Sequence, residues 1–316
     1  MINGKKIIKD YRLYDGMTVS SLVEQMRDAW GFTAGKIVAG MDLIEEMILN
    51  KECLKFLSFP ACIVATGTRG VIVEMIKRRL VDVIITTCGA IDHDLARSWK
   101  DYYRGSFGMN DVELHRRGIN RLGNILIPNE SYGMIIEKKM RELLMDLWDN
   151  DVREISTKDL CWTIGSRLCD ESSILYWAAK NNIPIYVPGI TDGAVGYQVW
   201  LFSQDHKIKL DILKDEQELN DLIFNAKYTG ALIIGGGISK HHVIWWNQFR
   251  GGLDYAVYIT TAVEWDGSLS GARVHEAISW GKVKETAKHV TIEGDATVIL
   301  PLIVAALISK ISRHKC

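Results

Sequence analysis

Four short apolar segments, each followed at once by glycine or small polar residues, constrain the fold of this chain more than any other feature. They are Val81–Thr87, Ile183–Pro188, Ala231–Ile234 and Tyr255–Thr261. Their apolar residues run almost without interruption, which is typical of strands that are buried on both faces. Separated by helix-length stretches, such strands predict a parallel α/β sheet whose ligands bind where the strands end.

Helical patterns lie between and before these segments. They cover Val19–Leu49, Arg69–Leu80, Tyr132–Trp148, Ser172–Asn181, Glu216–Ala226 and His241–Phe249. We therefore expect a Rossmann-like parallel sheet with helices on both faces, preceded by a helical extension over residues 1–55. No linker rich in proline, glycine or serine and no internal repeat divides the 316 residues, so a single domain over 1–316 is expected.

The composition is that of an ordinary soluble globular protein, with 47% hydrophobic and 24% charged residues and a formal net charge of -1. No basic patch indicates nucleic-acid binding. The apolar run Ala296–Ile308 is too short to cross a bilayer and contains Pro301, so it predicts a buried helix. The six cysteines show no CxxC spacing and the N-terminus lacks a signal-peptide core, which together favour reduced thiols in the cytoplasm.

Lys282 is the first candidate for chemistry. It ends the stretch Glu276–Lys282, next to Trp280 and Gly281, after a loop rich in glycine and serine at Asp266–Arg273. A lysine held away from water loses its proton more easily, and the free amine can attack an imine or a carbonyl carbon. Taken alone, the residue could equally be a solvated lysine that follows a tryptophan.

The segment Gly235–His242 follows an apolar strand and opens a helix. Backbone N–H groups at such a point can approach a pyrophosphate, although glycines are also needed there simply to turn the chain. One of the two adjacent histidines, His241 and His242, could act as a general base. Joint metal ligation is not expected, because neighbours on a helix point about 100° apart.

Several carboxylates lie in positions suited to ligand binding. Asp92 and Asp94 flank His93 just past the first apolar segment, where they could bind a cationic substrate or cap a helix; no second cluster supports a metal site. Others lie in or beside loops: Asp192, Glu264, Asp266, Glu276 and Asp295. If several converge near Lys282, they would form an acidic pocket for a polyamine; otherwise each is a solvated surface group.

Six segments, taken together and in this order, resemble the deoxyhypusine synthase family, most closely its archaeal members. They are Val81–Ala90, Gly118–Asn129, Thr191–Gly196, Gly235–His242, Asp254–Ala262 and Glu276–Lys282. The resemblance runs from about residue 60 to the end of the chain. Several long motifs in one order are far more specific than any single glycine-rich turn.

The resemblance implies an NAD-dependent transferase. Spermidine would be oxidised beside its secondary amine and cleaved, releasing 1,3-diaminopropane. Lys282 would hold the butylamine part as a covalent imine and pass it to a specific lysine of the precursor of the hypusine-bearing translation factor. The family works as a homotetramer with sites shared between subunits, so self-association is also implied.

The same resemblance implies roles for individual residues. Lys282 would be the nucleophile and His241 the base. Cofactor contacts would come from Thr87, Cys88, Gly89, Asp192, Gly236, Thr261, Ala262, Asp295 and Ala296. Substrate contacts would come from Asp92, His93, Gly267, Ser268, Ser270, Gly271, Glu276 and Trp280. No metal is expected.

The chain departs from the family pattern at several positions. Residues 61–65 stand where other members have a serine-asparagine nucleotide loop, and His93, Tyr197 and Leu269 stand where they have acids that face spermidine. The polyamine would then be held by other acids, bind in a shifted pose or differ from spermidine. Two alternatives stay open: aminobutyl transfer to a free diamine, as in homospermidine synthases, and an inactive NAD-binding partner subunit.

Overall fold

The computed structural model describes residues 5–314 as a mixed α/β protein. Six of its strands form one sheet in the order β11-β10-β9-β1-β2-β7. The pairs β10 with β11, β10 with β9 and β2 with β7 are all parallel, and helices flank the sheet. The parallel α/β fold predicted from the sequence is thereby confirmed.

The described residues divide into two compact units, where the sequence shows no break and predicts a single domain. Unit 1 holds residues 5–56 and 225–314, and unit 2 holds residues 57–224. The chain passes from unit 1 to unit 2 within a buried strand, β1 (Cys53–Phe59). Composition cannot mark a boundary that lies inside a strand, because both sides of it are equally apolar.

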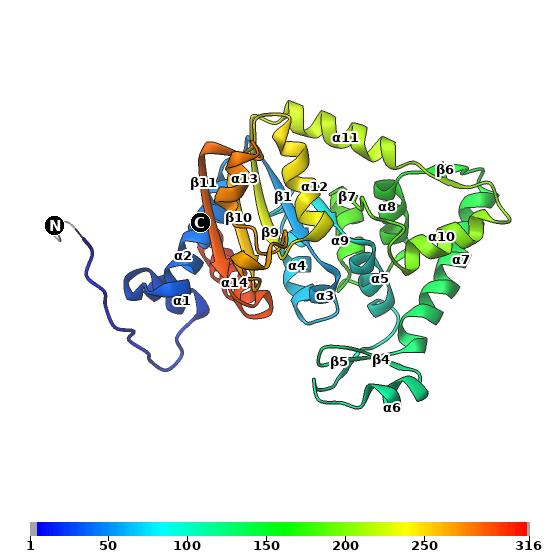
Figure 1. Ribbon diagram of the computed structural model, residues 1–316, viewed down its shortest axis with the longest axis horizontal. Coiled ribbons are helices and arrows are strands. Elements are labelled where there is room, and N and C mark those ends of the chain that lie inside the picture. The colour runs from blue at the N-terminus through cyan, green and yellow to red at the C-terminus, as the bar shows by residue number, and fades with distance from the viewer. Residues whose placement is uncertain (1–4, 315–316) are drawn as a thin grey trace. The chain divides into compact units, whose positions relative to one another are not determined.

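Unit 1 combines the N-terminal helices with the C-terminal part of the chain (Figure 1). Besides the start of β1, its elements are α1 (Val19–Ala29), α2 (Phe32–Leu49), β9 (Tyr228–Ile234), α12 (Gly237–Gln248), β10 (Leu253–Thr260), η2 (Glu264–Asp266), α13 (Val274–Ser279), β11 (Val283–Glu293) and α14 (Ala296–His314). The strand residues 231–234 are at most 2% exposed, and burying each aliphatic side chain contributes about 1.5–3 kcal/mol.

The two faces of the unit 1 strands carry different helices. Successive side chains of a strand point to opposite faces of the sheet, so the contacts of Val257 and Tyr258 in β10 show which helices pack on each face. A Cβ placed on Gly40 of α2 would lie 3.4 Å from the Val257 side chain, whereas Tyr258 lines a pocket together with residues of α12 and α13. Helix α2 therefore packs on one face, with α14 beside it, and α12 and α13 lie on the other.

The predicted N-terminal helical segment Val19–Leu49 is two helices rather than one. Thr18 caps α1 by accepting a hydrogen bond from the Ser21 amide. The helix ends at Trp30 and Gly31, whose φ angles are 51° and 76°. A left-handed backbone at two consecutive residues stops the α-helical hydrogen-bond ladder, and α2 starts again at Phe32.

Unit 2 is a helical body around the strands β2 and β7, with two small additional sheets. Its helices are α3 (Ala61–Val64), α4 (Thr68–Lys77), α5 (Cys88–Arg97), α6 (Asp111–Arg116), η1 (Asn129–Ser131), α7 (Gly133–Asp149), α8 (Thr157–Arg167), α9 (Ile174–Asn181), α10 (Ala194–Ser203) and α11 (Ile212–Asn225). Its strands are β2 (Val83–Thr86), β3 (Tyr103–Arg104), β4 (Ile119–Leu122), β5 (Ile125–Pro128), β6 (Glu154–Ile155), β7 (Ile185–Tyr186) and β8 (Lys209–Leu210).

The apolar run Ala296–Ile308 forms most of α14, as predicted. Leu300, Ile303 and Leu307 are fully buried, and Pro301 lies inside the helix. Among the helices of residues 5–314, none has the length and apolarity needed to span a membrane.

Candidate active site

Lys282 lies in the tight turn that joins α13 to β11. Its amide donates to the Ala277 carbonyl at 3.0 Å, and the preceding Gly281 has a φ of 65° that suits glycine. The Lys282 carbonyl accepts from the Leu253 amide at 3.1 Å, so the backbone is held on both sides. The half-buried side chain places its ammonium 5.1 Å from the centroid of the Trp280 ring, within cation–π range.

A cavity of about 160 Å³ connects Lys282 with the helices and the loop on its face of the sheet. Its lining residues are Lys240, Ile244, Tyr258, Leu269, Ala272, Arg273, Glu276, Ala277, Trp280 and Lys282. Lys282 precedes its strand, at the end opposite the carboxyl edge where α/β ligands usually bind. The cavity joins it to Leu269 and Ala272, which follow the carboxyl end of β10.

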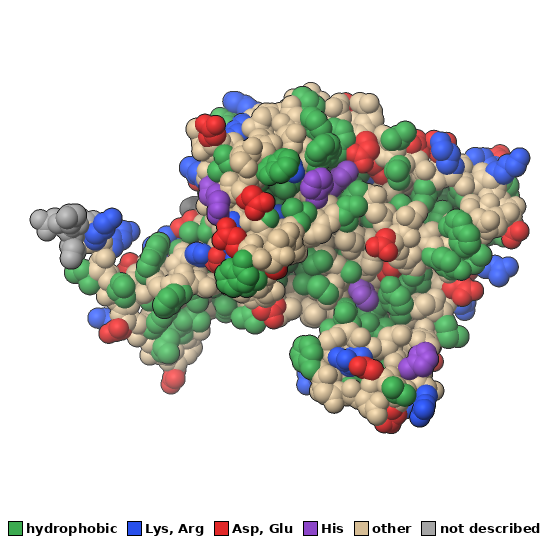
Figure 2. Space-filling model, in the orientation of Figure 1, with side chains coloured by type: hydrophobic (Ala, Val, Ile, Leu, Met, Phe, Trp, Pro, Cys, Tyr) green, Lys and Arg blue, Asp and Glu red, His purple; other side chains and the backbone are tan. Residues whose placement is uncertain are grey.

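His241 lies in the second turn of α12 and is half-buried. Burial, together with the charge of Lys282 and the neighbouring His242, lowers the pKa of His241 below its usual 6.5. Its imidazole is therefore neutral at neutral pH and can accept a proton. The ring stacks on Trp245 with centroids 5.7 Å apart, and Figure 2 shows histidine side chains beside hydrophobic ones over α12.

The glycine-rich turn after β9 touches the loop 266–273 closely. A Cβ on Gly236 would lie 2.3 Å from Oγ and 2.5 Å from Cα of Ser270. A Cβ on Gly271 would lie 2.1 Å from the Val263 carbonyl oxygen. The Asp266 carboxylate accepts from the Ser268 amide at 2.7 Å, and Gly267 has a left-handed φ of 69°. These contacts explain the glycines of both segments.

The other cofactor candidates of unit 1 share one edge of its sheet. Because β9, β10 and β11 are parallel neighbours, the residues after them lie side by side. Gly235 donates to the Ile259 carbonyl at 2.8 Å and Gly294 to the Thr260 carbonyl at 2.9 Å. Gly236, Thr261, Ala262, Asp295 and Ala296 are gathered there, and the exposed Asp295 caps α14 through the Thr297 amide.

The cofactor candidates of unit 2 follow β2 and β7, which are also parallel neighbours. Thr87 is the N-cap of α5, and Cys88 and Gly89 form its first turn. The buried Thr87 hydroxyl has no hydrogen-bond partner among the described residues. Asp192 is exposed in the turn before α10.

Asp92, a predicted substrate contact, lies in the middle of α5 and is fully buried. One carboxylate oxygen accepts from the Ala194 amide and the Tyr132 hydroxyl; the other accepts from the Val195 amide and the Cys88 thiol. Burial raises the pKa of Asp92, while these bonds favour its ionised form. The carboxylate thus caps α10, and both of its oxygens are occupied in this structure.

The two neighbours of Asp92 in α5 are also engaged within unit 2. His93 shares a 2.9 Å hydrogen bond with the Tyr102 hydroxyl, and burial lowers the pKa of His93 to about 4. Asp94 pairs with the buried Arg69 and accepts from the Ile174 amide at the start of α9. The sequence allowed Asp92 or Asp94 to cap the helix that follows them. In the structure Asp92 caps α10 and Asp94 caps α9, which lie far along the chain.

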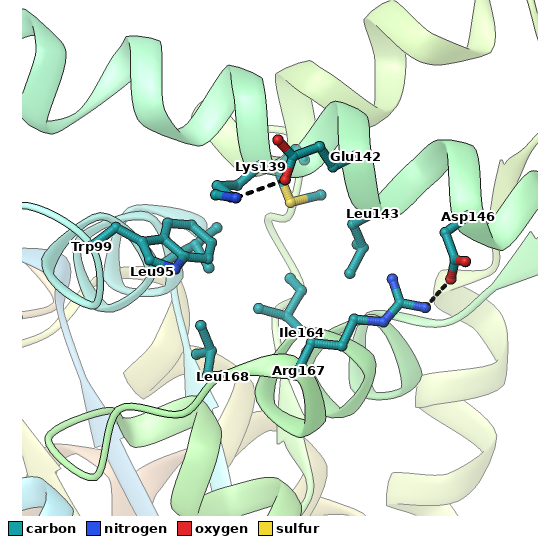
Figure 3. Close-up of a pocket in the computed structure, with 10 residues that line it drawn as sticks. Leu95, Trp99, Lys139, Glu142, Leu143, Asp146, Ile164, Arg167 and Leu168 are labelled. Carbon is teal, nitrogen blue, oxygen red and sulfur yellow. Dashed lines mark hydrogen bonds and ion pairs between the residues drawn. The ribbon is translucent and has the colours of Figure 1, made fainter.

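A larger cavity of about 380 Å³ lies in unit 2 between α5, α7 and α8 (Figure 3). Apolar side chains such as Leu95, Leu143 and Ile164 line it, and the pairs Lys139–Glu142 and Arg167–Asp146 lie at its rim. None of the predicted site residues lines this cavity. Its polar groups are already paired, so the smaller cavity at Lys282 is the better candidate for chemistry.

Comparisons with known proteins decide the family. The family model for deoxyhypusine synthase matches residues 21–307. A relative from Picrophilus torridus, named probable deoxyhypusine synthase, is 55% identical over 302 residues and covers 95% of this chain and 96% of its own length. One of the same name from Thermoplasma volcanium is 56% identical over 301 residues, again covering 95% and 96%. The chain belongs to the deoxyhypusine synthase family.

Members of this family are transferases, so the chain is an enzyme of that class. A crystal structure described as a deoxyhypusine synthase from Entamoeba histolytica has the same fold, with a TM-score of 0.67 at 22% identity over 96% of this chain and 97% of that one. The resemblance read from six segments of the sequence is confirmed.

The three positions that depart from the deoxyhypusine synthase pattern have different surroundings. Leu269 lines the cavity at Lys282, where it adds apolar surface in place of an acid. Tyr197 is 52% exposed on α10 and packs against Trp200 with ring centroids 5.4 Å apart. His93 packs its ring against Tyr102 and Tyr132.

Two residues of the cavity were missed by the sequence analysis. Lys240 is 1% exposed, and Tyr258 has a buried hydroxyl without a partner among the described residues. A signal for Lys240 was present: it shares a helix face with the buried Val243, Ile244 and Asn247, at spacings of three, four and seven residues. A lysine on an apolar helix face is unusual, because lysine is rarely buried.

Proposed function

We propose that this chain moves the 4-aminobutyl group of spermidine, through a covalent imine on Lys282, to one lysine of the precursor of the hypusine-bearing translation factor. Family membership supports the transfer. The observation that carries the mechanism is the small cavity in unit 1 that Lys282 lines. The charge of Lys282 also contributes to lowering the pKa of the half-buried His241. A lysine amine and a neutral imidazole are the groups that imine exchange requires.

The substrate end of the proposal rests on the lining of this cavity. Glu276 is the single carboxylate among the described residues that line it, and Ile244, Leu269 and Ala277 supply apolar surface. They offer apolar surface to a four-carbon chain and one acid to its terminal ammonium, while Lys240, Arg273 and Lys282 add positive charge to the same lining. The Trp280 ring, 5.1 Å from the Lys282 ammonium, offers a further face for a cation.

The described residues also fit NAD as the cofactor. In unit 1, the Gly235–Gly237 turn lies beyond the carboxyl end of β9 and opens α12, and backbone N–H groups at such a helix start can approach a pyrophosphate. In unit 2, the buried Thr87 hydroxyl at the start of α5 has no hydrogen-bond partner among the described residues and is available to a polar ligand. Bound NAD would supply the acceptor and later the donor of one hydride.

The proton and bond changes fall to two side chains. His241 takes a proton from the secondary amine of the substrate, because its pKa is lowered and its ring is neutral. Loss of this proton from nitrogen, and of a hydride from the adjacent carbon to the cofactor, would give a substrate imine whose carbon Lys282 attacks. The new C–N bond forms, the proton of the attacking amine passes to the propylamine nitrogen, and the bond to that nitrogen breaks, which releases 1,3-diaminopropane. The acceptor lysine then displaces Lys282 in the same way.

A homotetramer with shared sites, and a cytoplasmic location, complete the proposal. Trp280, which lines the cavity, is 62% exposed, and Trp265 in η2 is 86% exposed; a second copy of the chain would cover these indoles. Among the described residues, Cys53, Cys62, Cys88, Cys161 and Cys169 form no disulfide, in keeping with a reducing compartment.

The proposed reaction is tested by mass spectrometry of the purified chain mixed with NAD, spermidine and the translation-factor precursor. A mass gain of one aminobutyl group on a precursor lysine, with release of 1,3-diaminopropane, is the expected result. Putrescine offered in place of the protein separates this reaction from homospermidine synthesis. Product that forms with putrescine and not with the protein would overturn the assignment of the acceptor.

A further inference from the structure

Lys240 is a buried lysine that the reaction above does not use. Its side chain is 1% exposed, although lysine is among the residues least often buried. Its Nζ donates to the Leu269 carbonyl at 2.7 Å and to the Ala272 carbonyl at 2.8 Å, and it lies 4.2 Å from the centroid of the Tyr258 ring. The ammonium is therefore held by two main-chain oxygens and one aromatic face.

Both carbonyls belong to the loop 266–273, which covers the cavity at Lys282. Between them, the Ser270 carbonyl accepts from the Thr260 hydroxyl at 2.9 Å. Three inward-pointing carbonyls within four residues fix the path of the loop. They also set the place of Ser270, which a Cβ on Gly236 would meet at 2.5 Å. The loop is thus contacted twice: Lys240 donates to its Leu269 and Ala272 carbonyls, and the Gly236 backbone packs against its Ser270.

We propose that Lys240 is a positioning residue: its ammonium holds the loop 266–273 closed over the cavity that receives the polyamine. The effect of Lys240 on polyamine binding rests on the proposed function, whereas its hold on the loop rests on the hydrogen bonds alone. Two charge-assisted hydrogen bonds to one loop are stronger than neutral ones, and their loss leaves two carbonyls without their donor.

Burial and nearby charges make the hydrogen bonds from Lys240 to the loop weaken at alkaline pH. Burial lowers the pKa of Lys240 to about 8; Glu276 on α13 acts in the opposite direction and Arg273 in the same one. The other titratable groups that face it are Tyr258 on β10, Lys282 across the cavity and His241 next to it on α12. Above pH 8 the amine is neutral, so it donates weaker hydrogen bonds and loses its attraction to the Tyr258 ring.

Hydrogen exchange of the loop amides 268–273, without substrate, tests the hold directly. In Lys240→Met these amides should exchange about tenfold faster or more at pH 7. In the wild type, protection corrected for intrinsic exchange should fall as the pH rises through about 8, and in Lys240→Met it should not. In Lys240→Gln, which keeps a neutral N–H donor group, the exchange rate should lie between those of the wild type and Lys240→Met. In Lys288→Met, a change at an exposed lysine, the rate should match the wild type.

Thr260→Val, at the end of β10, is the matched control for a neutral contact to the same loop. It removes the neutral hydrogen bond donated to the Ser270 carbonyl and also the one accepted from the Ala262 amide, and it should loosen the loop without changing its pH dependence. In the transfer assay, Lys240→Met should raise the KM for spermidine about tenfold while Lys282 can still be trapped at saturating substrate. Unchanged exchange in the variant, or wild-type protection that stays level through pH 8, would overturn the proposal. A wild-type chain with no transfer activity but with these exchange effects would reject the proposed function alone.

Discussion

Gly236 and Ser270 approach so closely that no side chain fits at position 236. A Cβ there would lie 2.5 Å from both the amide nitrogen and Cα of Ser270, and backbone atoms cannot swing aside as the end of a long side chain can. The glycine turn after β9 and the loop after β10 are thus packed backbone to backbone.

Gly236→Ala should therefore displace the loop and reduce transfer activity at least about a hundredfold, with weaker NAD binding, because a shift of about 1 Å is enough for such a loss. Steady-state kinetics and NAD titration measure this. Gly70→Ala is the matched control: a Cβ there meets nothing within 4 Å, so activity should be unchanged. Full activity in Gly236→Ala would mean that the loop is not part of the site.

Asp92→Ala should destabilise the fold rather than act on a ligand. The change leaves the amides of Ala194 and Val195 and the Tyr132 hydroxyl without their acceptor, at a cost of at least about 3 kcal/mol in the free energy of unfolding. Urea denaturation measures it. The exposed Asp192→Ala should stay within about 0.5 kcal/mol of the wild type. An Asp92→Ala protein of normal stability with a raised KM for spermidine would restore its predicted role as a substrate contact.

The pH profile of the enzyme should report the environment of His241. Its pKa is lowered, so the base stays unprotonated to more acidic pH and the acid limb of kcat/KM should lie below pH 6.5. His242→Gln removes one of the causes of the lowering and should move that limb toward 6.5. His241→Asn should lose the limb together with most of the activity. A limb above 6.5 would contradict this assignment.

Leu269→Asp should add a second acid to the cavity, which Glu276 already lines. The side chain of Leu269 lines the cavity, whereas its backbone carbonyl accepts a hydrogen bond from Lys240. The side chain can therefore be replaced without removing that hydrogen bond. A carboxylate facing a bound ammonium should lower the KM for spermidine about tenfold, and the uncharged Leu269→Asn should change it little. An unchanged KM in both variants would show that the polyamine does not reach this wall.

The order of strands and helices that carries the site was largely readable from the sequence. The segment Tyr255–Thr261 became β10 and Ala231–Ile234 became β9, because uninterrupted apolar runs leave little alternative to a buried strand. The edge strand β11 was missed. Its exposed positions carry charges such as Lys288, so it does not read as apolar, and only pairing with β10 identifies it.

The sequence singled out Lys282 and His241 as candidates for chemistry; the structure places Lys282 at a cavity, its charge lowers the pKa of His241, and their catalytic roles stay predictions. Asp92 was predicted to contact substrate because it follows a strand, and that role stays a prediction. Its hydrogen bonds to the start of α10, about 100 residues away, are contacts that local patterns cannot show. The contacts of Lys240 depend on a loop 29 residues further along the chain. Long-range pairing of this kind decides whether a polar residue is structural or catalytic.

The central claim is that Lys282 carries the four-carbon fragment between donor and acceptor. Borohydride added to the enzyme with NAD and butyl-labelled spermidine, followed by peptide mapping, tests it most directly. The account predicts one stable label on Lys282, absent in Lys282→Ala and present in Lys284→Ala, both with wild-type circular dichroism. Label on another lysine, or label that persists in Lys282→Ala, would contradict it.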